Sequence, residues 1–471
     1  MKAELVAESG SFRDPSGRVY ELGGRIIRGI DGATAEDFEK LSREKFFIRG
    51  MEKGGIIPST QIVSEEFSGE DFSGNVSWAG FLEHEKIPFI SYPYEWSFSM
   101  LRDAALLQLG ILEDAFNAGW MMKDATPYNI QWRGAKPVFI DTPSFLPRMK
   151  GEQWVSYRQF CMLFLTPLML KGYLDINHTD ILRANLDGLT PPEAACYFRG
   201  LSRFRRGVLS HIFFPATVER SIAKRERDAV PVQKRKGVIQ SDAMVLGLIQ
   251  QMKRLVTSIN RPIGHTDWSK YELTHSYEDM DFKEKEAFVN VHSGSRHRSM
   301  VWDIGCNTGH FSKIVAKFSE TVIAIDGDHD AVEQLYLRES AQENSNILPL
   351  NLNLANLSPA QGWAGSERKA FDKRGRPELV LCLALIHHMR ISANIPCALF
   401  LDWLSSLKSE AIIEFVDRSD EMVIKLLANK KEQYDDYSLE IFERQVRERF
   451  EVIASQDLKG GKRRIYMLRP K

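Results

Sequence analysis

Short apolar runs and helical segments alternate along the last third of the chain. The apolar runs predict strands at residues 301–304, 321–326, 347–352, 378–383 and 411–415. Apolar residues at helical spacing predict helices between them, at 310–318, 328–338 and 399–407. Two more β runs flank Gly460 and Gly461 and predict a terminal hairpin. Strands that alternate with helices indicate a mostly parallel sheet with one antiparallel edge.

A glycine-rich turn joins the first of these strands to the next helix. Its spacing is Asp303-x-Gly305-x-x-x-Gly309, with Cys306 and Asn307 inside it, and it differs from the GxGxxG pattern of NAD sites. Glycines let the backbone approach a ligand, and the helix start directs N–H groups at it. The Asp303 carboxylate suits the ammonium and sulfonium of S-adenosylmethionine and would repel the pyrophosphate of NAD. A purely structural turn is the alternative.

Asp326 ends the second strand of this domain and precedes Gly327. It follows Gly305 by 21 residues. An acid at the tip of the second strand is placed to accept hydrogen bonds from two ribose hydroxyls. The alternative role is that of an N-cap for the helix predicted at 328–338.

These residues resemble a known enzyme family. Residues 299–470 resemble class I S-adenosylmethionine-dependent methyltransferases, through Asp303, Gly305, Gly309, Asp326 and the Ala-Leu-Ile-His-His sequence at 384–388. The resemblance implies a Rossmann-like domain at 296–471 and S-adenosylmethionine as the cofactor. It implies further cofactor contacts from Gly327, Asn353 and Leu383, besides Cys306 and Asn307 in the turn. For Asn353, an Asx turn is an equal alternative.

The whole chain also resembles a narrower bacterial group of predicted methyltransferases that includes nodulation-protein-like members. This resemblance rests on four stretches, at 90–106, 123–130, 137–145 and 384–388. It suggests a saccharide-type acceptor but assigns no residue to one.

Methyl transfer requires alignment of the acceptor and often a general base. His387 and His388 follow the fourth strand, where one of them is a candidate base for a hydroxyl or an amine. A pair of structural histidines is the alternative. Glu414, at the end of the fifth strand, is a second candidate base. Upstream, Trp268, Tyr271 and Tyr277 are candidates for a lid over the cofactor or for ordinary helix packing.

The N-terminal part contains a kinase-like pattern. Asp124 and Asn129 have the spacing D-x-x-x-x-N of a kinase catalytic loop, and Asp141 follows a predicted strand at 137–140, as a metal-binding Asp does. Asp141 is followed by Thr-Pro instead of Phe-Gly, and no phosphate-binding glycine loop is present. The weak candidates for the nucleotide-binding lysine are Lys45, Lys53 and Arg28. A degenerate scaffold is favoured over an active kinase, and a simple turn is the third reading.

Length and composition complete the picture. A length of 471 residues predicts at least two domains. We expect an α+β N-terminal domain at 1–225, a linker and helical lid at 226–295, and the methyltransferase domain at 296–471. A helix at 241–259, capped by Ser241 or Asp242, is expected to lead into the second domain. The net charge of -1 gives no argument for a nucleic-acid substrate. Five cysteines without a CxxC pair indicate a reduced, cytoplasmic protein without structural metal, and no signal peptide or membrane span is expected.

The sequence therefore predicts a methyltransferase that acts on a hydroxyl or amine of a small-molecule or saccharide-type acceptor. The alternatives are a bifunctional kinase–methyltransferase, a protein side chain as acceptor, and a binding module without activity. The sequence gives no oligomeric state.

Overall fold

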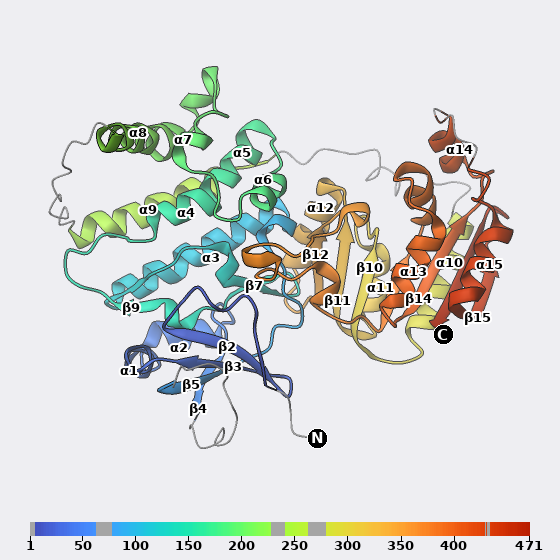
Figure 1. The fold of residues 1–471 in the computed structure, drawn as a ribbon, viewed down its shortest axis with the longest axis horizontal. Helices are drawn as coiled ribbons and strands as arrows, with labels where there is room; N and C mark the ends of the chain where they lie inside the picture. Colours follow the sequence, from blue (N-terminus) through green and yellow to red (C-terminus); the bar gives the residue numbers. More distant parts are fainter. Residues whose placement is uncertain (1–4, 63–77, 228–240, 262–278, 429, 431–433) are drawn as a thin grey trace. The chain divides into compact units, whose positions relative to one another are not determined.

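The computed structural model describes residues 5–62, 78–227, 241–261, 279–428, 430 and 434–471 (Figure 1). The chain forms two compact units. Unit 1 comprises residues 1–132, 137–262 and 361–368, and unit 2 comprises residues 133–136, 263–360 and 369–471.

Unit 1 begins with a five-stranded antiparallel sheet of order β1-β2-β3-β5-β4. Its strands are β1 (Leu5–Ala7), β2 (Gly17–Leu22), β3 (Arg25–Ile30), β4 (Ser59–Ile62) and β5 (Gly80–His84). Helices α1 (Gly32–Leu41) and α2 (Lys45–Glu52) follow β3, and Asp31 caps α1 by accepting a hydrogen bond from the Thr34 backbone N–H. The combination of sheet and helices agrees with the α+β prediction for this part of the chain.

The rest of unit 1 is mainly helical and centres on α3 (Phe98–Asn117), which buries twelve of its residues. Two strand pairs follow it, β6 (Trp120–Met122) with β9 (Phe145–Pro147) and β7 (Ile130–Arg133) with β8 (Lys136–Phe139). The remaining α-helices are α4 (Tyr157–Phe160), α5 (Thr166–Leu174), α6 (His178–Ala184), α7 (Pro191–Ala194), α8 (Phe214–Arg227) and α9 (Asp242–Ser258).

Helix α9 belongs to unit 1. Ser241 caps it, as predicted, by accepting a hydrogen bond from the Met244 N–H. The helix packs against α3 within unit 1, and residues of unit 2 follow it in the sequence from position 263. Its apolar side, with Val245, Ile249 and Met252 fully buried, explains the placement, because that side needs a partner surface.

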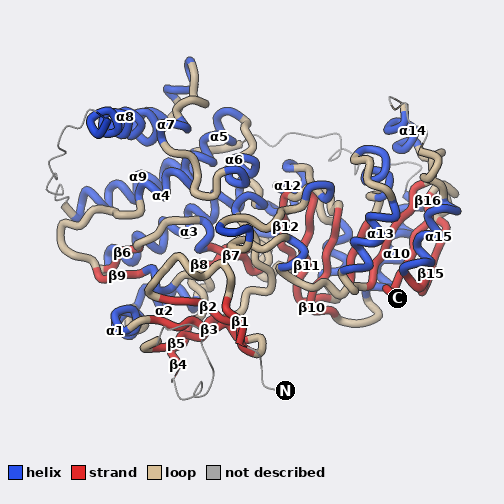
Figure 2. The backbone as a smooth tube through the Cα atoms, viewed as in Figure 1, coloured by secondary structure: helices blue, strands red, loops and turns tan. Residues whose placement is uncertain are grey.

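Unit 2 is a seven-stranded sheet of order β12-β11-β10-β13-β14-β16-β15. The first five strands in this order are parallel: β12 (Ile347–Asn351), β11 (Ser319–Asp326), β10 (Arg298–Ile304), β13 (Leu379–Cys382) and β14 (Glu410–Val416). Strand β16 (Arg463–Pro470) lies between β14 and β15 (Phe450–Asp457) and is antiparallel to both. Figure 2 shows these strands side by side. The predicted strands and the terminal hairpin are confirmed.

The helices of unit 2 are α10 (Asp279–Ser293), α11 (His310–Ala316), α12 (His329–Ser340), α13 (Cys397–Ser406), α14 (Glu421–Leu427) and α15 (Leu439–Arg449). Helix α10 packs against α11 and β16, and α13 packs against α15. The core between helices and sheet is built from buried aliphatic residues such as Val301, Val322 and Ile412. Parallel strands covered by helices read as continuous apolar runs, which is why the sequence predicted them well.

Candidate active site

The turn after β10 is held against the next strand of the sheet. The backbone N–H groups of Gly305 and Cys306 donate to the Ile325 carbonyl at 2.9 and 3.1 Å. Gly305, Asn307 and Gly309 all have positive φ, of 77°, 50° and 82°. A Cβ on Gly309 would lie 2.4 Å from a methyl carbon of Leu335, so this position accepts only glycine without rearrangement.

Asp326 closes this turn from the end of β11. One carboxylate oxygen accepts the Asn307 N–H and the other accepts the Asp328 N–H, each at 2.8 Å. The N-cap of α12 is Asp328, which accepts from the N–H groups of Asp330 and Ala331, so Asp326 does not have the capping role. Burial raises the pKa of Asp326, although the N–H donors counteract it. Each oxygen retains lone-pair capacity for a further donor.

Asp303 lies one strand away and is 2% exposed. Its carboxylate accepts a hydrogen bond from the Ser312 hydroxyl at 2.5 Å. Burial, with a smaller contribution from the negative charge of Asp326, raises the pKa of Asp303 to about 7. A cation beside this carboxylate would offset the cost of its burial.

The other predicted cofactor residues surround the same sheet edge. Cys306 and Leu383 are buried, and burial raises the pKa of the Cys306 thiol, which therefore stays protonated at neutral pH. Gly327 lies next to Asn353, since a Cβ on Gly327 would be 3.7 Å from the Asn353 Cα. The Asn353 side-chain oxygen accepts the Ala355 N–H at 2.9 Å, which is the Asx turn expected as one of two alternatives.

His387 and His388 begin the helical turn that follows β13, with ring centroids 4.2 Å apart. His387 is 2% exposed, and its Nδ1 atom is buried with no hydrogen-bond partner among the described residues. Burial, followed by the neighbouring His388 and Arg463, lowers the pKa of His387 to about 3. Burial also lowers the pKa of His388. Both rings are therefore neutral near pH 7; the His387 ring is a weak base in this buried setting, and its Nδ1 atom has no hydrogen-bond partner among the described residues.

Glu414, the other candidate base, is fully buried on β14. One of its oxygens accepts from the Lys285 ammonium and from the Ala384 N–H, both at 2.8 Å, and the other accepts from Arg463 at 3.4 Å. Burial alone would raise its pKa, but Lys285 and Arg463 outweigh that effect and lower it to about 2. A carboxylate with these partners is suited to positioning the segment after β13 more than to accepting a proton.

No pattern in the sequence indicates that Lys285 and Arg463 are the cationic partners of Glu414. The partners lie 129 and 49 positions from Glu414 in the sequence, so no local spacing connects them. The aromatic lid candidates Trp268, Tyr271 and Tyr277 lie outside the described residues.

The kinase-like residues meet in unit 1. The Asn129 side-chain amide donates to one oxygen of Asp141 at 3.1 Å, and Arg28 on β3 donates to the other at 2.5 Å. Burial, with the charge of Asp141, raises the pKa of Asp124. Of the three weak lysine-position candidates, Arg28 is the one in contact with Asp141. Lys45 begins α2 and Lys53 follows its end.

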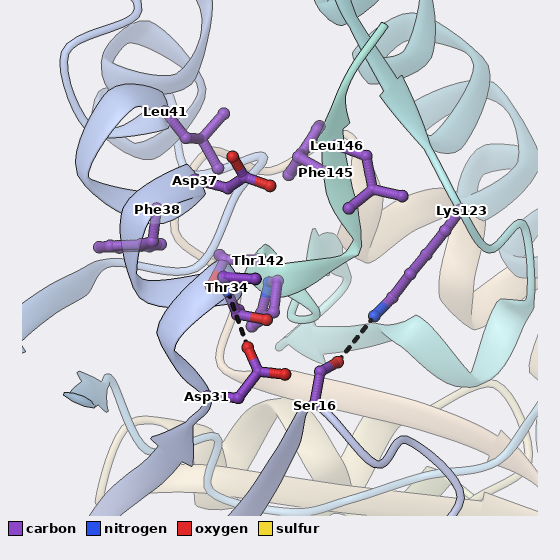
Figure 3. Close-up of a pocket in the computed structure, with 12 residues that line it drawn as sticks. Ser16, Asp31, Thr34, Asp37, Phe38, Leu41, Lys123, Thr142, Phe145 and Leu146 are labelled. Atoms are coloured by element: carbon purple, nitrogen blue, oxygen red, sulfur yellow. Dashed lines mark hydrogen bonds between the residues drawn. The ribbon is translucent and has the colours of Figure 1, made fainter. Parts of the chain in front are cut away.

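A small pocket of roughly 180 Å³ lies beside this cluster in unit 1. Figure 3 shows that Lys123 extends across it toward Ser16, with α1 residues such as Asp37 and Phe38 on the other side. Its lining includes Thr142 but none of Asp124, Asn129 or Asp141. Among the residues that the structure describes, no group of three or more His, Cys, Asp or Glu side chains is arranged to hold a metal ion. No described helix is long and apolar enough to cross a membrane.

Comparison with solved structures finds methyltransferases at low similarity. The N-methyltransferase NodS from Bradyrhizobium japonicum WM9 is 12% identical, with 41% of this chain and 97% of that chain covered, at a TM-score of 0.30. The magnesium protoporphyrin IX methyltransferase ChlM from Synechocystis PCC 6803, with bound SAH, is 14% identical, with 44% and 93% covered, at a TM-score of 0.32. Similarity this low carries no argument about the function of the present chain.

No family model matches the chain. Among curated proteins, Nodulation protein NoeA of Rhizobium meliloti (strain 1021) is 32% identical over 461 residues, which cover 97% of this chain and 95% of the relative. Similarity of this extent spans both units, and it shows that the chain belongs to the same family as NoeA.

Proposed function

We propose that this protein is a class I S-adenosylmethionine-dependent methyltransferase whose cofactor site is the carboxyl edge of the unit 2 sheet. The observation that carries the proposal is the turn at 305–309 closed by Asp326, at the centre of a sheet of order β12-β11-β10-β13-β14-β16-β15. Ligands of open α/β sheets bind at this edge, where the chain reverses its direction of strand addition.

The residues present fit S-adenosylmethionine. Gly305 and Gly309 leave the turn without side chains at two positions of positive φ. The Asp326 oxygens each accept one backbone N–H and have room to accept a ribose hydroxyl. Asp303 is a buried carboxylate, and a cationic ligand beside it would lower its raised pKa. When bound, the cofactor supplies an activated methyl group on a sulfonium.

His387 is the favoured candidate base. It is neutral at physiological pH, and its Nδ1 accepts no hydrogen bond from the described residues. We assign Glu414 the role of a positioning residue, since its hydrogen bond from the Ala384 N–H fixes the segment that leads into His387. Ala384 has a positive φ of 49°, a conformation that an alanine adopts only when its surroundings impose it.

The proposed acceptor is a hydroxyl or amine of a small-molecule or saccharide-type compound. The support is the position of the His387 imidazole directly after β13, at the carboxyl edge of the sheet, and membership of a family that contains a protein named for nodulation. A protein side chain is the alternative acceptor.

Cofactor binding tests the proposal first. Calorimetric titration with S-adenosylmethionine and S-adenosylhomocysteine is expected to give micromolar affinity. D326N keeps one acceptor oxygen but removes the charge, and at least a tenfold loss of affinity is expected. D402A removes an exposed carboxylate of α13 that pairs with Arg449 and serves as the control. Absence of binding by the wild-type protein would refute the proposal.

Acceptor screening follows with methyl-labelled cofactor and panels of amino sugars, oligosaccharides, small phenols and proteins. H387A is expected to lower kcat strongly while cofactor affinity is retained. Equal turnover in the wild type and H387A would exclude His387 as the base, and H388A then tests its neighbour.

For unit 1 we propose a degenerate kinase-like scaffold. Asp124, Asn129 and Asp141 have the order of a phosphotransferase loop, but the Asp141 carboxylate is occupied by Arg28 and Asn129. An ion pair with arginine competes with a divalent cation for the same oxygens. Titration with Mg-ATP is expected to show no binding at millimolar nucleotide. Binding that is lost in D141A would instead establish the bifunctional kinase–methyltransferase.

A further inference from the structure

Exposed apolar side chains are concentrated just before and along α8 in unit 1. The most exposed are Leu201 (87%), Phe204 (71%) and Phe214 (70%), and Val218 and Ile222 are also exposed. We call these five residues the α8 patch. Exposed apolar side chains gathered in one short segment of a folded protein indicate an interaction site.

The α8 part of the patch is a regular stripe. Phe214, Val218 and Ile222 are spaced by four residues, so they lie on one face of the helix. At 100° per residue, the buried Ala216 is about 160° from the centre of this stripe. The helix therefore packs on the unit through Ala216 and directs the stripe away from it. Figure 1 shows α8 at the margin of unit 1 that is farthest from the N-terminal sheet.

The same segment is strongly basic. Residues 199–227 contain eight Lys and Arg residues and only two Glu, although the whole chain has a net charge of -1. Arg203, Arg205, Arg206, Arg220 and Lys224 are exposed. Of the two acids, Glu219 already pairs with Arg158 at 2.9 Å. The patch is thus an apolar stripe bordered by cations.

We propose that the α8 patch binds the surface of an anionic lipid membrane, with its apolar side chains inserted at the level of the headgroups. Basic residues that border an apolar helix face match a negatively charged bilayer in both charge and polarity. Leucine, valine and isoleucine make up three of the five patch residues. Phe204 and Phe214 have rings that can stack on bases, but the three aliphatic residues do not, whereas a membrane surface accommodates all five, so a membrane fits this surface better than a single-stranded nucleic acid does.

Sedimentation of the full-length protein with sucrose-loaded vesicles tests the proposal. Vesicles of phosphatidylcholine with phosphatidylserine are expected to bind the protein, and pure phosphatidylcholine vesicles are expected to bind it at least about tenfold more weakly. F204S/F214S/I222S is expected to lose most of the binding to anionic vesicles. V291S/L399S/I424S removes three apolar side chains of unit 2 that are 53–64% exposed, and it is expected to bind like the wild type.

Three results would overturn the proposal. The first is that the protein sediments equally with vesicles with and without phosphatidylserine, or with neither. The second is binding to single-stranded RNA that the serine variant loses, which would make the patch a nucleic-acid surface. The third is a dimer of the wild-type protein, seen by analytical ultracentrifugation, that the serine variant converts to a monomer. Cofactor titration of the same variants reports separately on the proposed methyltransferase function, because unit 2 is unchanged in F204S/F214S/I222S.

Discussion

Lys285 and Glu414 form an ion pair of 2.8 Å in the core of unit 2, where both side chains are buried. It joins α10, the first described helix of this unit, to β14, an inner strand of its sheet. The same Glu414 oxygen accepts the Ala384 N–H, so one carboxylate connects a helix, a strand and the segment that carries the paired histidines.

Removal of the cation is expected to destabilise unit 2. K285M leaves Glu414 with a more distant Arg463 as its remaining cation, and breaking a buried ion pair typically costs about 3–5 kcal/mol. The free energy of unfolding from urea titrations measures the loss. K283M changes an exposed lysine two residues away on the same helix and is expected to alter the stability by less than about 0.5 kcal/mol. A K285M protein as stable as K283M would show that the pair contributes nothing net.

The glycine turn makes a second prediction. G309A places a Cβ at positive φ and 2.4 Å from Leu335, and a destabilisation of about 1–3 kcal/mol is expected together with weakened cofactor binding. Thermal unfolding and cofactor titration measure the two effects. G110A is the matched control, because Gly110 lies inside α3 with open space around it, and alanine there is expected to stabilise by about 0.5–1 kcal/mol. Unchanged stability of G309A would mean that Leu335 on α12 moves aside without a cost in free energy.

Asp303 predicts a pH dependence. Its pKa is about 7 in the folded protein and 3.8 as its ordinary value, so the folded state retains a proton that the unfolded state releases. Its contribution to stability therefore falls as the pH rises from about 4 to about 7, by at most about 4 kcal/mol. The difference in unfolding free energy between the wild type and D303N isolates this group from His387, whose lowered pKa acts in the opposite direction below pH 6.5. A constant difference across this range would contradict the raised pKa.

The same carboxyl group links proton release to cofactor binding. A cation beside Asp303 favours its ionised form, so affinity for S-adenosylmethionine is expected to rise up to tenfold per pH unit below 7 and to level off above it. Titrations at pH 6, 7 and 8 in buffers of different ionisation enthalpy measure both the affinity and the released proton. D303N is expected to bind weakly with no such slope. If wild-type binding releases no proton near pH 6, Asp303 does not meet the cation.

Experiment can separate the two possible roles of Asn353, an Asx turn and a contact with adenine. N353A removes the hydrogen bond to the Ala355 N–H and is expected to cost about 1 kcal/mol of stability. The affinities for S-adenosylhomocysteine and for its 6-deaminated analogue are then compared in both proteins. If Asn353 also contacts adenine, the ratio of these affinities is expected to be smaller in N353A than in the wild type. An unchanged preference leaves the Asx turn as its role.

The sheet of unit 2 was predictable from sequence because each parallel strand is apolar on both faces. The run at Val322–Ile325 is buried throughout, and the acid that ends it marks the strand's carboxyl edge. The turn was equally visible, since the positive φ of Gly305 and Gly309 is a local requirement that selects glycine at that spacing. Local patterns sufficed wherever a residue's role depends on its own strand or turn.

The parts that escaped prediction depend on contacts between distant segments. Lys285 appears in a helix of mixed charge, and its sequence context gives no sign that Glu414 will neutralise it. Arg28 was a weak candidate until β3 brought it to Asp141, 113 positions away. Helix α9 has an apolar face that any surface could cover, and its pattern does not specify α3.

The position of β16 between β14 and β15 has a consequence for how this protein is made. Strands β14 and β15 both leave the ribosome before β16. Each of them pairs with β16 in the sheet, along an edge that has no other strand beside it. Two strand edges of unit 2 therefore stay unpaired until residues 463–470 emerge. Exposed edges of this kind invite pairing with other chains, so the nascent protein gains protection from edge-to-edge aggregation only when β16 pairs with β14 and β15.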